Sequence, residues 1–195
     1  MHNRVIVSEV HNVAAFENAF RCPTWHIESA PLFAAHFAPL LRNETVVAVS
    51  PDAGGAKRVE QFRQALEQLV RKDIGSAYME KFRSSGVVSG ELLAGDVRDK
   101  VAIIVDDLIS TGGTLVRAAR ACRTGGATRV FAAATHGLFI DGAPELFATE
   151  ALDGIVIANT LPPFRVPTDL ATKRLTVLDA SESIARVISM CHDGS

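Results

Sequence analysis

The chain has 195 residues, 48% of them hydrophobic and 22% charged, which suits one globular domain with a substantial core. Its net charge of −2 gives no general attraction to nucleic acid or to anionic membranes, so any phosphate must be bound by a local site. Cys22, Cys122 and Cys191 are odd in number and widely spaced, which argues against a disulfide framework or a zinc site. With neither a membrane-length apolar stretch nor a signal segment, the sequence predicts a cytoplasmic protein without membrane or nucleic-acid partners.

Short runs rich in valine and isoleucine recur without alternating with polar residues, as expected for strands that are covered on both faces. These runs are residues 5–7, 46–49, 101–105, 130–134, 155–157 and 175–178. Strands that alternate with helices predict βαβ units. We therefore expect an α/β fold with a parallel sheet flanked by helices on both faces, in a single domain that spans residues 1–195.

Apolar residues at helical spacing lie between these runs and predict four helices. The helices are expected at residues 31–41, 59–69, 115–122 and 184–191. The second helix should bury one face formed by Val59, Phe62, Leu66 and Leu69. Gly125 and Gly126 should end the third helix, and Ser181 should cap the last one. Small residues from Ser84 to Gly90 predict a mobile loop.

The strongest chemical signal is the segment from Val101 to Thr114. The segment predicts a buried strand that carries Asp106 and Asp107 at its end, then a turn rich in hydroxyl groups and glycine, and then the start of a helix. The backbone N–H groups that can converge on a phosphate belong to Ser110, Thr111, Gly112, Gly113 and Thr114. The two carboxylates can accept hydrogen bonds from ribose hydroxyls, because ligands bind at this edge of open α/β sheets. The alternative is an ordinary strand end followed by a helix cap.

This segment resembles the phosphoribosyl pyrophosphate-binding motif of the type I phosphoribosyltransferase fold, with strand, acidic pair, turn and helix in the same order. The resemblance implies a parallel α/β sheet of that type. It also implies that Asp106 and Asp107 contact ribose and that the turn from Ser110 to Thr114 holds the 5-phosphate.

A second strand, turn and helix start runs from Val49 to Arg58 and is similar to a stretch of the phosphoribosyl pyrophosphate synthetases. Gly54 and Gly55 would permit close approach of a phosphate chain, and Asp52 would be available for Mg²⁺. Without the resemblance, the same residues could simply start a helix.

Lys81 and Arg83 form a Lys-x-Arg pair similar to the one that begins the catalytic loop of the synthetases. Residues two apart on an extended segment point to the same side, so one phosphate chain could meet both cations. The resemblance implies that they stabilise the transferred diphosphate. The alternative is a pair of solvated basic residues, which are common on protein surfaces.

The segment Glu9-Val10-His11 resembles the Asp-Leu-His of the synthetases, where the histidine helps to bind the Mg²⁺–ATP complex. The resemblance therefore implies a metal-binding role for His11, although a lone histidine is more often structural. The residues from Ala134 to Phe139 are similar to a later landmark of the family, but we assign no chemistry to His136.

The resemblance covers nearly the whole chain but only the C-terminal part of a synthetase, and the family's N-terminal domain is absent. That domain supplies much of the adenine-binding surface, in part across a subunit interface. The phosphate turn also departs from the family, because Ser110 stands where synthetases usually have an acidic residue. A serine at this position is more typical of enzymes that transfer the ribose phosphate to a base.

The resemblance thus implies a ribose-phosphate diphosphokinase that moves the diphosphate of ATP, with Mg²⁺, onto the anomeric hydroxyl of ribose 5-phosphate. Such a protein would act as a homo-oligomer or with a separate N-terminal synthetase subunit. Two alternatives stay open. One is a phosphoribosyltransferase that consumes phosphoribosyl pyrophosphate and a nucleobase. The other is a non-catalytic regulatory subunit that pairs with an active synthetase.

Overall fold

The computed structural model describes residues 4–84 and 87–193, and for residues 81–84, 87–91 and 193 it describes the backbone only. Its main sheet has the strand order β5-β4-β3-β6-β7-β8-β9, and every neighbouring pair is parallel except β4 and β5. The strands are β3 (Val46–Ser50), β4 (Gly75–Ser84), β5 (Val87–Ala94), β6 (Val101–Ile109), β7 (Arg129–Gly137), β8 (Gly154–Ala158) and β9 (Leu175–Leu178). The expected α/β fold with a largely parallel sheet is confirmed.

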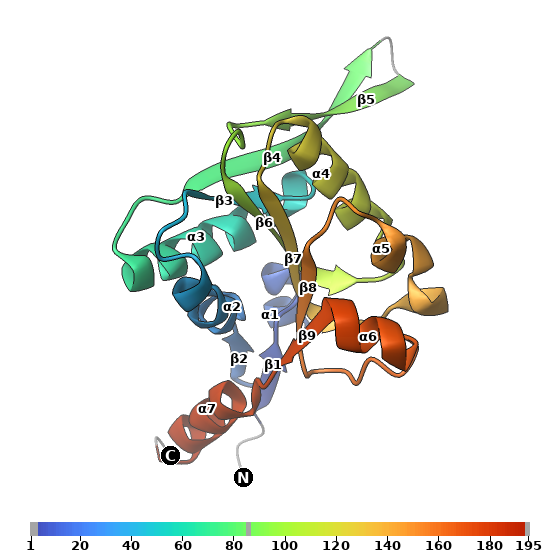
Figure 1. Cartoon of the computed structure of the whole chain (residues 1–195). Coiled ribbons are helices and arrows are strands. Elements are labelled where there is room, and N and C mark those ends of the chain that lie inside the picture. The colour runs from blue at the N-terminus through green and yellow to red at the C-terminus, as the bar shows by residue number, and fades with distance from the viewer. Residues whose placement is uncertain (1–3, 85–86, 194–195) are drawn as a thin grey trace.

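Helices cover both faces of this sheet (Figure 1). The helices α2 (Ala30–Phe37) and α3 (Ala56–Val70) lie on one face, and α2 continues into the 3-10 turn η1 (Ala38–Leu40). The other face carries α4 (Gly113–Thr124), α5 (Pro144–Ala148) and α6 (Thr168–Arg174). Two further 3-10 turns, η2 (Ala53–Gly55) and η3 (Ile140–Gly142), follow β3 and β7.

Alternating side chains of the central strands feed two separate cores, one for each face. In β3, Val47 and Val49 pack toward α4, whereas Val46 and Ala48 pack toward α2 and α3. All of these residues are buried, because a parallel sheet enclosed by helices leaves neither face to water. The unbroken apolar runs in the sequence reflect this enclosure.

The last turn of α3 departs from the expected helix face. Val59, Phe62 and Leu66 are fully buried, but Leu69 is 54% exposed. The buried face continues instead to Val70, which packs against the same core. Position 70 follows Leu66 by four residues, and this spacing keeps a residue over the same face of a helix of 3.6 residues per turn.

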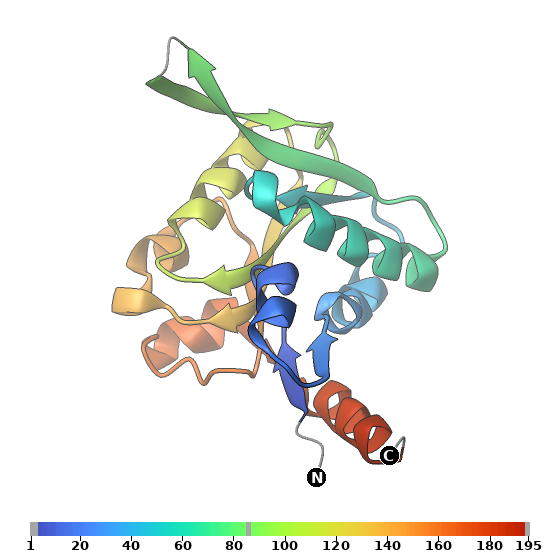
Figure 2. The ribbon, with the colours of Figure 1, turned by 180° about the vertical axis from the view of Figure 1, so that it is seen from behind.

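A second, smaller layer lies beside the main sheet and brings the two ends of the described chain together (Figures 1 and 2). It consists of the parallel strands β1 (Val5–Ser8) and β2 (Thr24–Ile27) with the helices α1 (Val13–Ala19) and α7 (Ser181–Asp193). The prediction of one sheet is therefore wrong for residues 5–7. The expected apolar face of α7 is only half buried, and Ile188 is 52% exposed, because α7 packs on a two-stranded layer alone.

Two local predictions are also corrected. Ser181 is the first residue of α7 rather than its cap, and the carboxylate of Asp179 accepts the Ser181 N–H at 2.9 Å. Of the loop expected from Ser84 to Gly90, Ser84 and residues 87–90 lie instead in the paired strands β4 and β5, whereas residues 85–86 lie outside the described part of the chain. Antiparallel pairing with the facing strand gives the backbone of the paired residues hydrogen-bond partners. The small side chains of the segment do not indicate this pairing in the sequence. The hairpin extends away from the rest of the molecule (Figure 1).

Within residues 4–84 and 87–193, no helix combines the length and the apolar character needed to cross a membrane.

The different burial of two apolar residues on α3 predicts different costs of truncation. Phe62→Ala should lower the free energy of unfolding by about 3–5 kcal/mol, because Phe62 is buried edge-on to Phe37 at 6.2 Å. Leu69→Ala on the same helix should change it by less than about 0.5 kcal/mol. Urea denaturation of both variants measures the difference, and equal costs would contradict the proposed packing of α3.

Candidate functional site

The chain reverses direction across the sheet between β3 and β6, which are paired in parallel. From β3 the chain continues to β4 on one side, and from β6 it continues to β7 on the other. Such a switch point opens a crevice at the carboxyl ends of the two strands, which is where open α/β sheets bind ligands. The segments that follow Ser50 and Ile109 therefore start at the same edge of the sheet.

The segment after β3 is held in a tight turn by its own side chains. Ser50 Oγ donates to the carbonyl oxygen of Asp52 at 2.6 Å, and Asp52 Oδ1 accepts the N–H groups of Gly54 and Gly55 at 2.8 and 3.1 Å. A Cβ atom at Gly55 would lie 2.5 Å from Ser50 Oγ, so this position requires glycine. The turn starts α3 with Arg58 in its first turn, facing the end of β6.

The segment after β6 forms a turn at residues 110–114, named the phosphate turn because the sequence predicts phosphate binding there. Gly112 has φ 82°, and a Cβ atom there would lie 2.7 Å from Leu146 Cβ, so the turn also requires glycine at this point. Helix α4 begins at Gly113, and the first N–H groups of a helix have no partners within it. The turn and Asp106 border a cavity of about 80 Å³. The structure thus places all five predicted turn residues around one small space.

Asp106 and Asp107 lie near the end of β6, with side chains 16% and 10% exposed. The Asp107 N–H donates to Asp106 Oδ1 at 2.8 Å. Burial, together with the hydrogen bond and negative charge of Asp107, raises the pKa of Asp106 to about 7. Burial opposes ionisation of Asp107 too, but its bond with Asp106 and the charges of Arg58 and His11 lower its pKa. The two neighbours therefore carry different charges near neutral pH.

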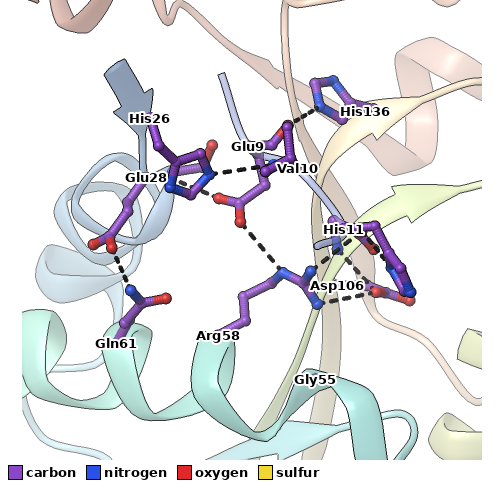
Figure 3. A network of polar contacts seen from close by, with 12 residues as sticks. Glu9, Val10, His11, His26, Glu28, Gly55, Arg58, Gln61, Asp106 and His136 are labelled. Carbon is purple, nitrogen blue, oxygen red and sulfur yellow. Dashed lines mark hydrogen bonds and ion pairs between the residues drawn. The ribbon is translucent and has the colours of Figure 1, made fainter. Parts of the chain in front are cut away.

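Arg58 joins this acidic pair to the N-terminal layer (Figure 3). Its guanidinium nitrogens lie 3.5 Å from Asp106 Oδ1, 3.2 Å from Asp107 Oδ2 and 3.6 Å from Glu9 Oε1. No role in the site was predicted from the sequence for Arg58 or for Glu9. The one local feature that could have indicated a role for Arg58 is its place in the first turn of a helix that follows a glycine turn.

His11 lies between β1 and α1 with 84% of its side chain exposed. Its Nδ1 atom is 2.9 Å from Asp107 Oδ2, so the structure does bring His11 to the acidic pair. Beside it is a cavity of about 270 Å³, wider than the one at the phosphate turn. The polar residues that border this larger cavity, the His11 cavity, are Glu9, His11, Asn12, His26, Lys57, Arg58 and Gln61.

The expected metal ligands, His11 and Asp52, make other contacts. Asp52 caps η2, and His11 contacts Asp107. In the described part of the chain, no three His, Cys, Asp or Glu side chains are grouped so that they could hold a metal ion. Mg²⁺ is often held by one or two carboxylates and the phosphates of a substrate. The paired Asp106 and Asp107 have carboxyl oxygens of the kind that Mg²⁺ prefers.

Lys81 and Arg83 both lie on β4, whose register with β5 shifts between Phe82 and Arg83. Their side chains are outside the described part of the chain, so their predicted contact with a phosphate chain stays a prediction. Strand β4 is paired with β3, and β3 leads into the turn at Asp52.

The sheet order and its switch-point crevice define an α/β protein with the type I phosphoribosyltransferase-like fold. The chain belongs to the phosphoribosyl synthetase-associated domain family, whose model matches residues 89–195. The solved phosphoribosylpyrophosphate synthetase from Mycobacterium smegmatis superposes with a TM-score of 0.84 and 29% identity, covering 98% of this chain and 59% of that one. The predicted fold and family are confirmed.

Relatives of known name support the same family. The ribose-phosphate pyrophosphokinase of Prochlorococcus marinus (strain MIT 9313) is 34% identical over 195 residues, 99% of this chain and 56% of that protein. Ribose-phosphate pyrophosphokinase A of Dictyostelium discoideum is 32% identical over 194 residues, 98% of this chain and 58% of that protein. The chain spans just over half the length of the curated relatives it matches.

The raised pKa of Asp106 predicts a pH-dependent gain in stability for Asp106→Asn. Between pH 4 and 7 the folded chain keeps a proton on Asp106 that the unfolded chain releases. The free energy of unfolding of the parent chain therefore falls as the pH rises through this window. An asparagine cannot ionise, and its Oδ1 atom can still accept the Asp107 N–H. The stability of the variant relative to the parent chain should therefore rise by roughly 2 kcal/mol between pH 5 and pH 8.

Urea denaturation at the two pH values tests this, with Asp169→Asn, an exposed residue on α6, as the control. If the difference in the free energy of unfolding between Asp106→Asn and the parent chain is the same at both pH values, Asp106 is already ionised at pH 5.

Proposed function

We propose that this chain carries the ribose-phosphate site and the phosphoryl-transfer groups of a ribose-phosphate diphosphokinase, in one phosphoribosyltransferase-type domain. The observation that carries the proposal is that two cavities are linked through one acidic pair and Arg58. The phosphate turn and Asp106 border a small cavity, and Arg58, whose guanidinium contacts both Asp106 and Asp107, borders the His11 cavity. Two phosphorylated substrates could meet over the carboxylates.

The ribose 5-phosphate would bind with its phosphate on the amides of residues 110–114. This site supplies the positive end of α4, which favours a negative group. The hydroxyls of the ribose would lie against Asp106 and Asp107. Asp107 would accept their hydrogen bonds as a carboxylate, and Asp106, with its pKa of about 7, could either accept or donate.

The triphosphate of ATP would enter the His11 cavity, with Lys57 and Arg58 offsetting its charge. Mg²⁺ would come with the nucleotide and neutralise phosphate charge at the acidic pair. Asp52 could contribute its remaining carboxylate oxygen from the turn after β3. These residues act by position and charge, without a covalent intermediate on the protein.

In the transfer step, the anomeric hydroxyl of ribose 5-phosphate attacks the β-phosphorus of ATP. A bond forms between that oxygen and the β-phosphorus, the bond from the β-phosphorus to the α,β-bridging oxygen breaks, and AMP leaves with that oxygen. The hydroxyl proton passes to solvent water, and phosphoribosyl pyrophosphate is the product. Lys81 and Arg83 would offset the charge on the moving diphosphate, as cations do in other phosphoryl transfers.

The adenine of ATP would be bound mainly outside the described residues. The relatives are almost twice as long as the matched region, and the part that this chain does not match could supply the remaining surface. We propose that another stretch of polypeptide, a second copy or a separate subunit completes the site. The ATP substrate and the three free cysteines favour a cytoplasmic location.

Formation of AMP from ATP, Mg²⁺ and ribose 5-phosphate is the expected activity of the purified protein. Release of pyrophosphate from phosphoribosyl pyrophosphate and a nucleobase would instead favour the base-transferring alternative, which Ser110 in the phosphate turn supports. Binding of ribose 5-phosphate without turnover, alone and with a synthetase present, would favour the regulatory alternative. Chromatographic separation of AMP from ATP detects the first outcome, a pyrophosphate assay the second, and calorimetric titration with ribose 5-phosphate the third.

Lys81→Ala should lower AMP formation by roughly 10²–10³-fold, the usual loss when one group that stabilises transition-state charge is removed. Binding of ribose 5-phosphate, measured by calorimetry, should change by no more than roughly twofold, because the proposed role concerns the diphosphate. Lys173→Ala, which removes an exposed cation on α6, is the matched control. A loss of binding that equals the loss of turnover would contradict the catalytic role of Lys81.

A further inference from the structure

The chain that follows β7 holds the peptide groups that carry the first two N–H groups of the phosphate turn. The carbonyl oxygen of Ile109 accepts the N–H groups of Leu138 and Phe139 at 2.9 and 3.2 Å. The carbonyl oxygen of Ser110 accepts the Ile140 N–H at 3.0 Å. These bonds extend the pairing of β6 with β7 beyond the ends of both strands, so the chain after β7 lies directly against the turn.

These bonds also set the direction in which the turn's N–H groups point. Every peptide bond among the described residues is trans, so the C=O and the N–H of one peptide group point in opposite directions. Because the carbonyls of Ile109 and Ser110 point to residues 138–143, which we call the support segment, the N–H groups of Ser110 and Thr111 point away from it. No residue of the support segment borders the small cavity at the turn. The two N–H groups are thus directed to a side of the turn that the support segment leaves open.

Helix α5, which follows the support segment, contacts the turn at a second point. The carbonyl oxygen of Ala143 accepts the Leu146 N–H at 3.1 Å in the first turn of this helix. Leu146 is fully buried, and its Cβ atom would lie 2.7 Å from a Cβ atom at Gly112. The turn is therefore held at Ser110 by a backbone bond and at Gly112 by packing, and both contacts depend on the position of the support segment.

The backbone of the support segment is strained. Phe139, Asp141 and Ala143 have φ angles of 47°, 53° and 45°, in the left-handed region that residues with a side chain rarely adopt. The ring of Phe139 is fully buried, with its centroid 5.4 Å from that of Phe147. A Cβ atom at Gly137 would lie 2.5 Å from the Phe139 ring, so glycine makes room for the ring. Strained residues that packing holds in place are typical of functional sites.

We propose that the support segment positions the phosphate turn: anchored by the buried ring of Phe139, its backbone fixes the N–H groups of Ser110 and Thr111 in the direction in which they bind a phosphate. Phe139 is then a positioning residue, because it acts through the turn and does not border the cavity. N–H groups that are already directed need no reordering when an anion binds. The consequence for phosphate binding rests on the proposed function, whereas the direction of the N–H groups does not.

The backbone bond is tested by replacing Ile140 with its α-hydroxy acid, which exchanges the N–H for an ester oxygen and keeps the side chain. The matched control is the same exchange at Ile184 on α7, which packs on β1 and β2 and whose N–H donates to the Ala180 carbonyl at 3.2 Å. Residual dipolar couplings, measured by NMR without ligand, report the direction of each N–H bond. The ester at Ile140 should change the coupling of Thr111 beyond experimental error, and the ester at Ile184 should not.

Binding of inorganic phosphate, followed by the amide signals of Thr111 and Gly113, should be at least roughly tenfold weaker in the Ile140 ester than in the parent chain. The reason is that misdirecting one N–H group removes a hydrogen bond to a charged ligand. The Ile184 ester should bind phosphate as tightly as the parent chain. Equal weakening by the two esters would overturn the positioning role, and so would an unchanged Thr111 coupling or unchanged phosphate binding in the Ile140 ester.

A second pair of variants tests the anchor and decides the question if the Ile140 ester does not fold. Phe139→Leu removes the ring that holds the strained backbone, whereas Phe33→Leu removes a similarly buried ring from the core on the other face of the sheet. Both should lower the midpoint of urea denaturation, but only Phe139→Leu should change the Thr111 coupling and weaken phosphate binding. Equal effects of the two variants on phosphate binding would show that Phe139 contributes to stability alone.

The outcome is separable from the proposed function. If the parent chain binds neither inorganic phosphate nor ribose 5-phosphate, the proposed function fails. The Thr111 coupling, compared between the parent chain and the variants, still decides whether the support segment directs the turn.

Discussion

The parallel pairing of β3 with β6 is the constraint on which the candidate site depends. Its register sets Val46 opposite Val101 and Val49 opposite Ile104, so both strands end at the same edge of the sheet. The turns that follow these two strands therefore lie at one edge of the sheet, where Arg58 at the start of α3 contacts Asp106 near the end of β6. One hydrogen-bonded ladder therefore brings the start of α3 and the phosphate turn together.

Burial of adjacent carboxylates at this edge is unfavourable unless other groups compensate their charge. Arg58 compensates part of this charge. The proton on Asp106 also compensates part of it, because the pKa of Asp106 is about 7. Such an arrangement lowers stability but leaves the site ready for cations and hydroxyl groups. Strongly shifted carboxyl pKa values beside a cavity are typical of functional sites, where binding outweighs the cost to the fold.

The N-terminal layer contributes little to the core but takes part in the site. None of the residues of α1 is buried, and β1 is half buried along its length. Yet the segment between these two elements carries Glu9 and His11, which contact Arg58 and Asp107. The small layer therefore affects the charge of the site more than the stability of the sheet.

The sequence by itself determined the central strands, the main helices and the turn from Ser110 to Thr114, because apolar periodicity and glycine requirements are local properties. Where packing was one-sided or absent, as along α7 and at Leu69, the same patterns overestimated burial. Only the tertiary structure decided that β1 leaves the main sheet and that residues 84 and 87–90 pair as a hairpin. It also decided the contacts of Arg58, because Glu9 and Asp106 lie 49 and 48 residues away along the chain, and no local pattern encodes contacts between such distant side chains.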